Sequence, residues 1–384
     1  MTEELEESLW SRMPADIREL VLQRLPLEVL YRFRAVCKHW RALPLSPEFC
    51  RSVTHPQSKH SYLLGIQPIG LLQTCPIYNP IAKSLSWIDL GFLESRFERF
   101  TFERWVNDDD PWGSSEFRGA SSDGGLLCVC VRIHESEQDA IFVCNPLTRA
   151  CNLLPLIEGN TWGMCLGLSI RVENYGHYRV FATKHGKVGN KFEQRLYTYD
   201  SVSASWKVVP KCTRFPHDSI SGAFCKGIYY ALYLEGSHEL VLMSYDTDHD
   251  AWVDTGVVVP CTSNSRAKLV VSNDRLFCVS YFHQNEHNLY VTISEVNLHT
   301  TMVLGISVSE IELPDQSQLF VHSNWDVLGY RNSLIFHTRS VAAFVFDFTT
   351  DLPEWRPMNL EPLGNSRSHI LLVALTFDLR AAVE

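Results

Sequence analysis

The 384-residue sequence predicts a multidomain α+β protein, in which a small N-terminal all-α domain precedes an all-β, six-bladed propeller. Three observations support this class. Apolar residues recur at helical spacing before residue 50, but at every second position beyond Leu64. The second region also repeats, since Trp206 and Trp252 lie 46 residues apart in similar segments. A repeat of this length, with room for about four short strands, is typical of one propeller blade.

The first predicted helix covers residues 14–25. Its apolar residues are three or four positions apart and share one stripe, which consists of Ile17, Leu20, Val21 and Leu25. A second helix is expected to begin at Pro26, because a proline at the first helical position has no N–H bond to lose.

This second helix, which begins with the segment PLEVLYRFRAV, carries two apolar stripes. One stripe is expected to face the first helix and consists of Leu27, Leu30 and Tyr31. The other follows the spacing i, i+3, i+4 and i+7 and consists of Phe33, Val36, Cys37 and Trp40. A helical region of ~40 residues is below the size at which a chain usually folds unaided. Something else must therefore cover the second stripe.

Two kinds of unit alternate beyond residue 60. One is a hairpin with a small or polar turn, as in AFCKGIYYALY; the other is a strand, an Asp or Asn turn and an aromatic residue, as in YTYDSVSASWKVVP. Counting these units predicts six blades, near residues 61–90, 120–155, 165–210, 220–258, 267–306 and 325–360. A strand within residues 368–380 is left over. It is expected to complete the first blade and close the ring, which removes exposed sheet edges.

The segment ESRFERFTFERWVNDDDPWGSSEF interrupts the repeat as an insertion at about residues 94–118. Long irregular connections are uncommon unless they are functional or disordered. The insertion is therefore a candidate substrate-contact loop, and a cover between the two domains is the alternative. Its candidate contact residues are aromatic or acidic, and they are Phe97, Phe100, Phe102, Trp105, Asp108, Asp109 and Asp110.

The composition argues against several classes of function. A formal net charge of −10 provides no basic excess for nucleic acid. The longest apolar run near the C-terminus, residues 370–375, is far shorter than the ~20 residues of a membrane helix. The acidic N-terminus does not resemble a secretory signal, and no N-x-S/T sequon occurs. These features favour a soluble protein in the cytoplasm, the nucleus or both.

No cofactor, metal site or catalytic residue is expected. The twelve cysteines include no C-x-x-C pair, and Cys128 and Cys130 have no second ligand pair at metal spacing. His283 and His287 fall in a polar connection, where loop roles explain them better than a metal. The nucleophile-elbow, dinucleotide, P-loop and zinc-protease motifs are all missing from the sequence. An enzymatic or small-molecule-sensing propeller remains the alternative, because a fold does not settle function.

Residues 10–49, WSRMPADIRELVLQRLPLEVLYRFRAVCKHWRALPLSPEF, resemble an F-box. The pattern is Leu-Pro, two short helices joined through Leu-Pro, an Arg-x-Val-Cys-Lys-x-Trp core and a Ser-Pro-x-Phe end, with Met13 replacing the first leucine. Through SSDGGLLCV and the Asp-turn-Trp repeats, the remainder is similar to the kelch-like, F-box-associated propeller of plant-type F-box proteins. We expect packing roles, rather than ligand stacking, for the repeat residues Trp206, Trp252, Trp355, Gly124 and Gly125.

The resemblance implies the division of the chain. Residues 1–9 would be an acidic extension, 10–50 the F-box, 51–60 a linker, 61–380 the propeller and 381–384 a tail.

The resemblance also implies a non-catalytic function. The chain would be the substrate-recognition subunit of an SCF-type (Skp1–cullin–F-box) E3 ubiquitin ligase. Its F-box would dock a Skp1-like adaptor, and through it a cullin–RING ligase, while its propeller would bind a protein substrate for ubiquitination. A non-degradative F-box scaffold or transcriptional cofactor is the alternative. The implied adaptor-binding residues are Met13, Pro14, Ile17, Val21, Leu25, Pro26, Leu30, Phe33, Val36, Cys37 and Trp40.

Overall fold

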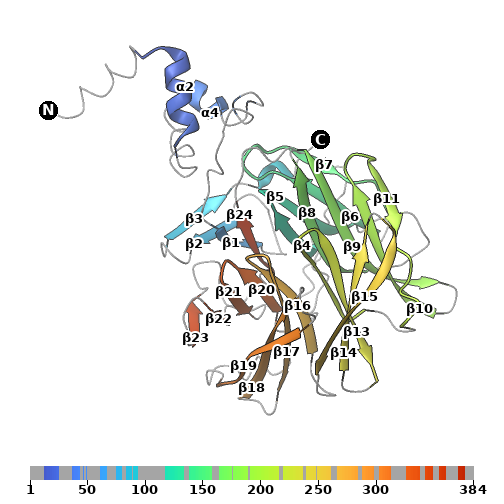
Figure 1. Ribbon diagram of the computed structural model, residues 1–384. Helices are drawn as coiled ribbons and strands as arrows, with labels where there is room; N and C mark the ends of the chain where they lie inside the picture. The colour runs from blue at the N-terminus through green and yellow to red at the C-terminus, as the bar shows by residue number, and fades with distance from the viewer. Residues whose placement is uncertain are drawn as a thin grey trace, which may run out of the picture.

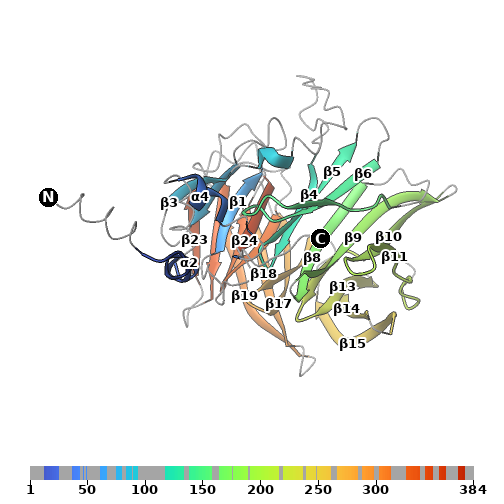
Figure 2. The same ribbon diagram turned by 90° about the horizontal axis from the view of Figure 1, so that it is seen from above.

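The computed structural model shows a small N-terminal helical region beside a ring of six β-sheets (Figures 1 and 2). It describes residues 13–25, 37–43, 46, 49, 61–66, 75–79, 84–88, 90–93, 117–133, 138–157, 164–174, 176–188, 191–215, 219–236, 239–247, 249–260, 266–283, 288–297, 302–312, 326–337, 342–348, 354–359 and 371–376. Among these residues, no helix is both long and apolar enough to cross a bilayer.

The first helix, α2 (Ala15–Gln23), lies within the predicted range. Asp16 in its first turn interacts favourably with the positive end of the helix dipole. The helix closes with the Arg24 N–H donating to the Val21 carbonyl at 3.1 Å. It stops just before Pro26, because a proline disfavours helical geometry in the residue that precedes it.

The second described helix, α4 (Lys38–Ala42), is short and begins only after Cys37. Cys37 itself is not helical, and its Sγ accepts a hydrogen bond from the Trp40 N–H at 3.4 Å. The predicted stripe that ran through Cys37 to Trp40 on one helix is therefore wrong at this point. The thiol satisfies an N–H that a continuous helix would have bonded to the backbone four residues earlier.

Each of the six sheets is one blade of four antiparallel strands. From the centre outward, blade 1 contains β24 (Leu371–Thr376), β1 (Ser61–Ile66), β2 (Cys75–Asn79) and β3 (Ser84–Ile88). Blade 2 contains β4 (Phe117–Asp123), β5 (Leu126–Ile133), β6 (Gln138–Cys144) and β7 (Cys151–Leu153). Blade 3 contains β8 (Met164–Asn174), β9 (His177–Val188), β10 (Lys191–Asp200) and β11 (Ser205–Val208).

The other three blades follow the same order. Blade 4 contains β12 (Ser221–Cys225), β13 (Ile228–Glu235), β14 (Glu239–Asp246) and β15 (Ala251–Pro260). Blade 5 contains β16 (Arg266–Ser272), β17 (Arg275–His283), β18 (Asn288–Asn297) and β19 (Met302–Glu312). Blade 6 contains β20 (Asp326–Tyr330), β21 (Ser333–His337), β22 (Ala342–Asp347) and β23 (Glu354–Asn359).

The ring closes through its last described strand. β24 pairs with β1 over six residues, from Ser61 opposite Thr376 to Ile66 opposite Leu371. The innermost strands contact one another in the order β24, β4, β8, β12, β16, β20 and again β24. The predicted six-bladed propeller, with its first blade completed by the strand from residues 368–380, is confirmed.

Two boundaries differ from the expectation. β4 begins at Phe117, so the last residues assigned to the insertion belong to blade 2. β19 continues to Glu312, beyond the predicted end of blade 5 at residue 306. Blade 5 has no tryptophan at the position that Trp252 occupies opposite Tyr245, because Val303 lies there, opposite Val296. The antiparallel ladder forms without it.

The apolar core is divided into six clusters, each between two neighbouring blades. Between blades 2 and 3, for example, Cys128 and Val143 pack with Tyr178 and Val180. The cluster between blades 1 and 2 also contains Leu22, Leu43 and Phe49 from the N-terminal domain. The helical domain is therefore anchored to the propeller at the side of blade 1 (Figure 1).

Candidate functional site

Two surfaces are candidates for binding, the outer face of α2 and the central channel of the propeller. On α2, Ile17 is 42% exposed and Leu20 is 49% exposed, whereas Leu22 is only 2% exposed. Ile17 and Leu20 are three positions apart and so share one face of the helix. Two large aliphatic side chains on one exposed face offer a partner an apolar contact.

The predicted adaptor residues fall into three groups. Pro14 and Cys37 are exposed, like Ile17, while Met13 and Val21 are partly buried. Leu25 and Trp40 are partly buried and pack against the chain's own cluster between blades 1 and 2. The remaining four lie outside the described residues, and they are Pro26, Leu30, Phe33 and Val36.

One residue of this face was missing from the predicted adaptor set. Leu20 was placed on the apolar stripe of the first helix, and its exposure is greater than that of Ile17. The helical spacing alone could not separate the two sides of α2, because apolar residues occur on both. The candidate substrate loop lies outside the described residues, from Phe97 to Asp110.

The central channel opens at one end into a cavity of about 680 Å³. The walls come mainly from the inner strands of blades 2 to 6, and the second or third strands of blades 3 to 5 add larger residues such as Thr183 and Gln194. Several side chains of the inner strands are small, which keeps the channel open. These small residues are Gly119, Ala120, Gly167, Ser169, Ser221, Gly222 and Ala267. The inner strands of all blades run along the channel in the same direction, so residues near the start of each inner strand lie at the same end of the channel. We call this end, which holds the cavity of about 680 Å³, the wide mouth.

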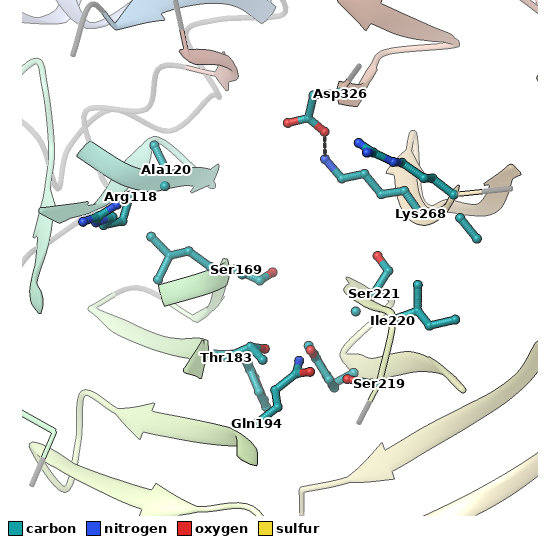
Figure 3. A pocket seen from close by; sticks show the side chains of 18 of the residues that line it. Arg118, Ala120, Ser169, Thr183, Gln194, Ser219, Ile220, Ser221, Lys268 and Asp326 are labelled. Atoms are coloured by element: carbon teal, nitrogen blue, oxygen red, sulfur yellow. Dashed lines mark hydrogen bonds and ion pairs between the residues drawn. The ribbon is translucent and has the colours of Figure 1, made fainter. Parts of the chain in front are cut away.

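Charged groups at the wide mouth are mostly positive. Its described lining contains three cationic side chains, Arg118, Arg266 and Lys268, and one carboxylate, Asp326. Figure 3 shows Arg118 and Lys268 on opposite sides of the opening, with Thr183 and Gln194 along a third side. Neutral hydrogen-bonding groups thus lie between the cations.

A β-bulge affects the direction of Arg118. The ladder between β4 and β5 shifts register between Phe117 and Gly119, so Arg118 has no residue directly opposite it. Such bulges bend a strand and redirect a side chain. Arg266 and Lys268 are two positions apart on β16 and therefore point to the same side of the strand.

Lys268 forms an ion pair with Asp326, from blade 5 to blade 6 (Figure 3). The Asp326 carboxylate also accepts a hydrogen bond from the Val327 N–H at 2.8 Å. Burial acts to raise the pKa of Asp326, but the charges of Lys268 and His337 outweigh it and lower that pKa to about 2. Asp326 is therefore ionised at neutral pH and balances one of the three cations.

The opposite end of the channel is more evenly charged. Its cavity of about 440 Å³ contains Asp123 beside Arg171, with 3.8 Å between Oδ2 and NH1. Asp123 also accepts the Val172 N–H at 2.8 Å, which links blade 2 to blade 3. Similar inner-strand bonds recur around the ring, such as the Leu269 N–H donating to Ser221 Oγ at 3.0 Å. These polar groups serve contacts between blades.

Two of the repeated tryptophans, Trp206 and Trp252, form hydrogen bonds to neighbouring blades, whereas the ring contacts of Trp355 lie within its own blade. Trp206 on β11 donates from Nε1 to the carbonyl of Pro155, which follows blade 2, at 2.7 Å. Trp252 on β15 donates in the same way to Pro210, which follows blade 3, at 2.6 Å. Trp355 packs against Phe346 and Phe336, with ring centroids 4.9 Å away in each case. At Gly124 and Gly125 the φ angles are 53° and 88°, as a tight hairpin turn requires.

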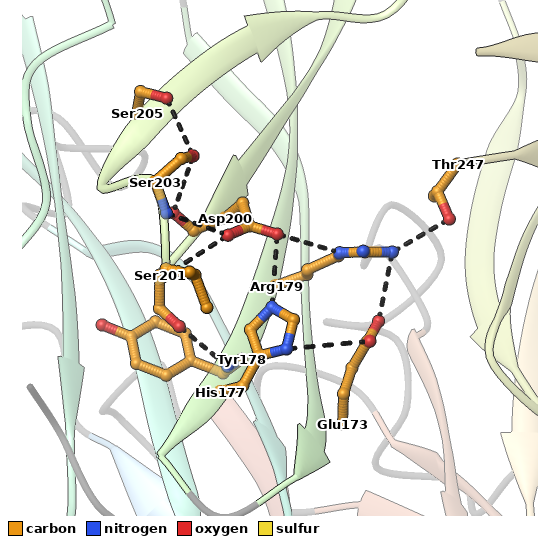
Figure 4. Close-up of polar contacts among 10 residues, drawn as sticks. Glu173, His177, Tyr178, Arg179, Asp200, Ser201, Ser203, Ser205 and Thr247 are labelled. Atoms are coloured by element: carbon orange, nitrogen blue, oxygen red, sulfur yellow. Dashed lines mark hydrogen bonds and ion pairs between the residues drawn. The ribbon is translucent and has the colours of Figure 1, made fainter. Parts of the chain in front are cut away.

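A polar network in blade 3 involves the histidine with the most carboxylate contacts described (Figure 4). His177 Nε2 lies 3.2 Å from Asp200 Oδ2, and its Nδ1 lies 4.0 Å from Glu173 Oε2. Arg179 bonds both carboxylates and also donates to Thr247 Oγ1 in blade 4 at 2.9 Å. Because both ring nitrogens face carboxylates, His177 is not placed to activate a nucleophile. The network joins two blades.

No cluster of three or more potential metal-ligating side chains occurs in the part of the chain that the structure describes. Of the two histidines considered in the sequence, His287 lies outside that part. The described geometry consists of an exposed apolar helical face and an open, cationic channel mouth. A helical domain attached to a closed six-bladed propeller with these surfaces has the form of a binding protein.

Comparison with known families identifies both domains. Residues 10–52 match the F-box domain, and residues 104–352 match the F-box associated beta propeller domain. The chain therefore belongs to the F-box proteins that carry an F-box-associated β-propeller.

Relatives of known sequence agree with this assignment. F-box only protein 6 of Arabidopsis thaliana is 24% identical over 73% of this chain and 55% of its own length. An F-box/kelch-repeat protein of the same plant is 27% identical over 65% of this chain and 55% of its own length. The chain thus spans about half the length of these two relatives. Among solved structures, the Dos1 propeller aligns with a TM-score of 0.39 and 10% identity, over 78% of this chain and 68% of that one.

Proposed function

We propose that this chain is the substrate-recognition subunit of an SCF-type E3 ubiquitin ligase. In this proposal the F-box binds a Skp1-like adaptor, which connects it to the cullin–RING ligase, and the propeller binds the protein to be ubiquitinated. The observation that carries the proposal is the exposed pair Ile17 and Leu20 on a helix whose opposite side carries the buried Leu22, a member of the apolar cluster that joins the helical domain to blades 1 and 2.

The exposed pair contributes part of the energy of such a contact. Fully burying one large aliphatic side chain contributes about 1.5–3 kcal/mol. Ile17 and Leu20 are 42% and 49% exposed, so covering what remains of both contributes roughly 1–3 kcal/mol in total toward association. Anchoring the helical domain to the propeller also limits the freedom lost on binding. In this proposal the ligase chemistry resides in other subunits.

The test is adaptor co-purification with the double variant Ile17→Asp, Leu20→Asp. We expect a loss of adaptor affinity of roughly 100-fold or more, because two charged groups would be buried at the contact. Val202→Asp is the matched control, since Val202 is an exposed apolar residue in blade 3, at 76% exposure. Unchanged adaptor binding by the double variant would contradict the proposed docking face.

Leu25 and Trp40 would be poorer test positions. Both pack against the chain's own cluster, so alanine there would loosen the helical domain as well as any adaptor contact. The exposed pair avoids this ambiguity, because neither side chain belongs to the buried core.

A further inference from the structure

We infer that the wide mouth of the propeller channel binds an acidic segment of a protein partner. This inference rests on the proposed function, in which the propeller holds a protein substrate, and it assigns the chemistry of the segment recognised. Three observations support it: the charge of the mouth, its hydrogen-bonding groups and its size.

Charge is the first observation. The chain carries a net charge of −10, yet the described lining of the mouth has three cations against one carboxylate. A positive opening in an acidic protein favours anionic groups at this place and disfavours cationic ones. Arg266 is exposed, and its side chain also forms a hydrogen bond with Tyr281 in the same blade.

Hydrogen bonding is the second observation. Gln194 and Ser219 line the mouth together with the cations, and each can donate or accept. An extended peptide has an N–H and a carbonyl at nearly every residue, and these need partners when the peptide enters a channel. The mouth thus provides cations for acidic side chains and neutral groups for the peptide backbone.

Size is the third observation. A cavity of about 680 Å³ lies within the range of roughly 300–1,000 Å³ typical of ligand pockets. The cations belong to different blades, Arg118 to blade 2 and the Arg266–Lys268 pair to blade 5. A segment with several acidic groups can contact both sides at once, whereas a single small anion can contact only one side closely.

Asp326 sets the strength of this site. Its carboxylate pairs with Lys268 and so reduces the charge available to a ligand. Replacing it with asparagine would free Lys268 and increase the net positive charge of the mouth. Removing Arg266 would have the opposite effect. The inference therefore requires two variants to change affinity in opposite directions, which general unfolding cannot produce.

The experiment is a fluorescence-anisotropy titration of the full chain with labelled peptides at low salt. The probes are a peptide of alternating Glu and Gly, its phosphoserine counterpart and a control with Lys in place of Glu. We expect the acidic peptides to bind at least about tenfold more tightly than the lysine peptide. We also expect binding to weaken as salt screens the charges.

Variants then locate the site. Arg266→Gln should weaken acidic-peptide binding by about five- to tenfold, and Asp326→Asn should strengthen it by a similar factor. Arg356→Gln is the charge-matched control, because Arg356 is exposed on β23, the outermost strand of blade 6. Its affinity should equal that of the unmodified chain.

Three outcomes would overturn the inference. The first is binding of the lysine peptide as tight as that of the acidic peptides. The second is a failure of the Arg266 and Asp326 variants to shift affinity in opposite directions. The third is displacement of the bound peptide by free glutamate at equal carboxylate concentration. The last result would indicate a site for small anions instead of a protein segment. Adaptor co-purification from the same preparations distinguishes the two proposals. If the chain binds the adaptor normally but does not bind the acidic peptides, the result contradicts this inference and not the proposed function.

Discussion

The indole Nε1 of Trp252 donates a hydrogen bond to the Pro210 carbonyl at 2.6 Å, which fastens the outer strand of blade 4 to the segment that leaves blade 3. Trp206 and Pro155 repeat this contact one blade earlier, at 2.7 Å. The outer parts of neighbouring blades are thus held by directed bonds as well as by apolar packing.

Trp252→Phe should lower the free energy of unfolding by about 1 kcal/mol more than Trp355→Phe does. A net hydrogen bond contributes about 0.5–1.5 kcal/mol, and the Trp252 variant loses one. The buried Nε1 of Trp355 has no hydrogen-bond partner among the described residues, so its replacement removes none. Chemical denaturation of both variants checks this. Equal losses would mean that the bond to Pro210 adds nothing to stability.

Gly124→Ala should destabilise the propeller more than Gly227→Ala. Both glycines have positive φ, 53° and 85°, and an alanine in that conformation is destabilised by about 1–2 kcal/mol. At Gly124 the new Cβ would also lie 2.8 Å from Val172 Cβ in blade 3, whereas nothing lies within 4 Å at Gly227. Melting temperatures of the pair measure the difference. Equal melting temperatures of the two variants would mean that blade 3 accommodates the added methyl group without a loss of stability.

Truncation after Gly364 should destabilise the whole propeller in one cooperative step. It removes β24, which pairs with six residues of β1, and leaves the inner edge of blade 1 without a partner. Calorimetry of the truncated chain would show a single transition at a lower temperature. A truncated protein as stable as the full chain would contradict closure of the ring through this strand.

Lowering the pH should reduce the free energy of unfolding of the propeller, in part because Asp326 becomes protonated. Its pKa in the folded chain is lowered from an ordinary value of 3.8 to about 2. A carboxyl with a lowered folded pKa stabilises the fold above its unfolded pKa, and that stability is lost as the pH falls from about 5 toward 2. Asp326→Asn should therefore flatten the pH dependence of the unfolding free energy in this window. The same slope in both proteins would show that Asp326 does not contribute.

Much of the fold could be predicted from the sequence, because its signals are local. Period-two apolar residues and Asp or Asn turns marked the strands, and their recurrence gave the blade count. Blade 5 shows why this worked without every motif residue. Val303 replaces the aromatic, yet the ladder with Val296 still forms, since backbone pairing and alternation suffice.

The adaptor face was only partly predictable. Helical spacing placed Ile17 and Leu20 on one stripe, but spacing does not tell which stripe faces the propeller. Trp40 was expected to face a partner, and the structure shows that part of its surface packs against the chain's own core. The break at Cys37 depends on a thiol hydrogen bond, which periodicity does not reveal.

The sequence by itself determined the two-domain order, the six blades and the F-box resemblance, since each follows from residues close together in the chain. Only the tertiary structure decided the cationic mouth. Arg118 and Arg266 are 148 positions apart in the sequence, and they line the same mouth because every inner strand enters the channel in the same direction. The ring closure and a bulge at Arg118 complete that site, and no local pattern encodes either one.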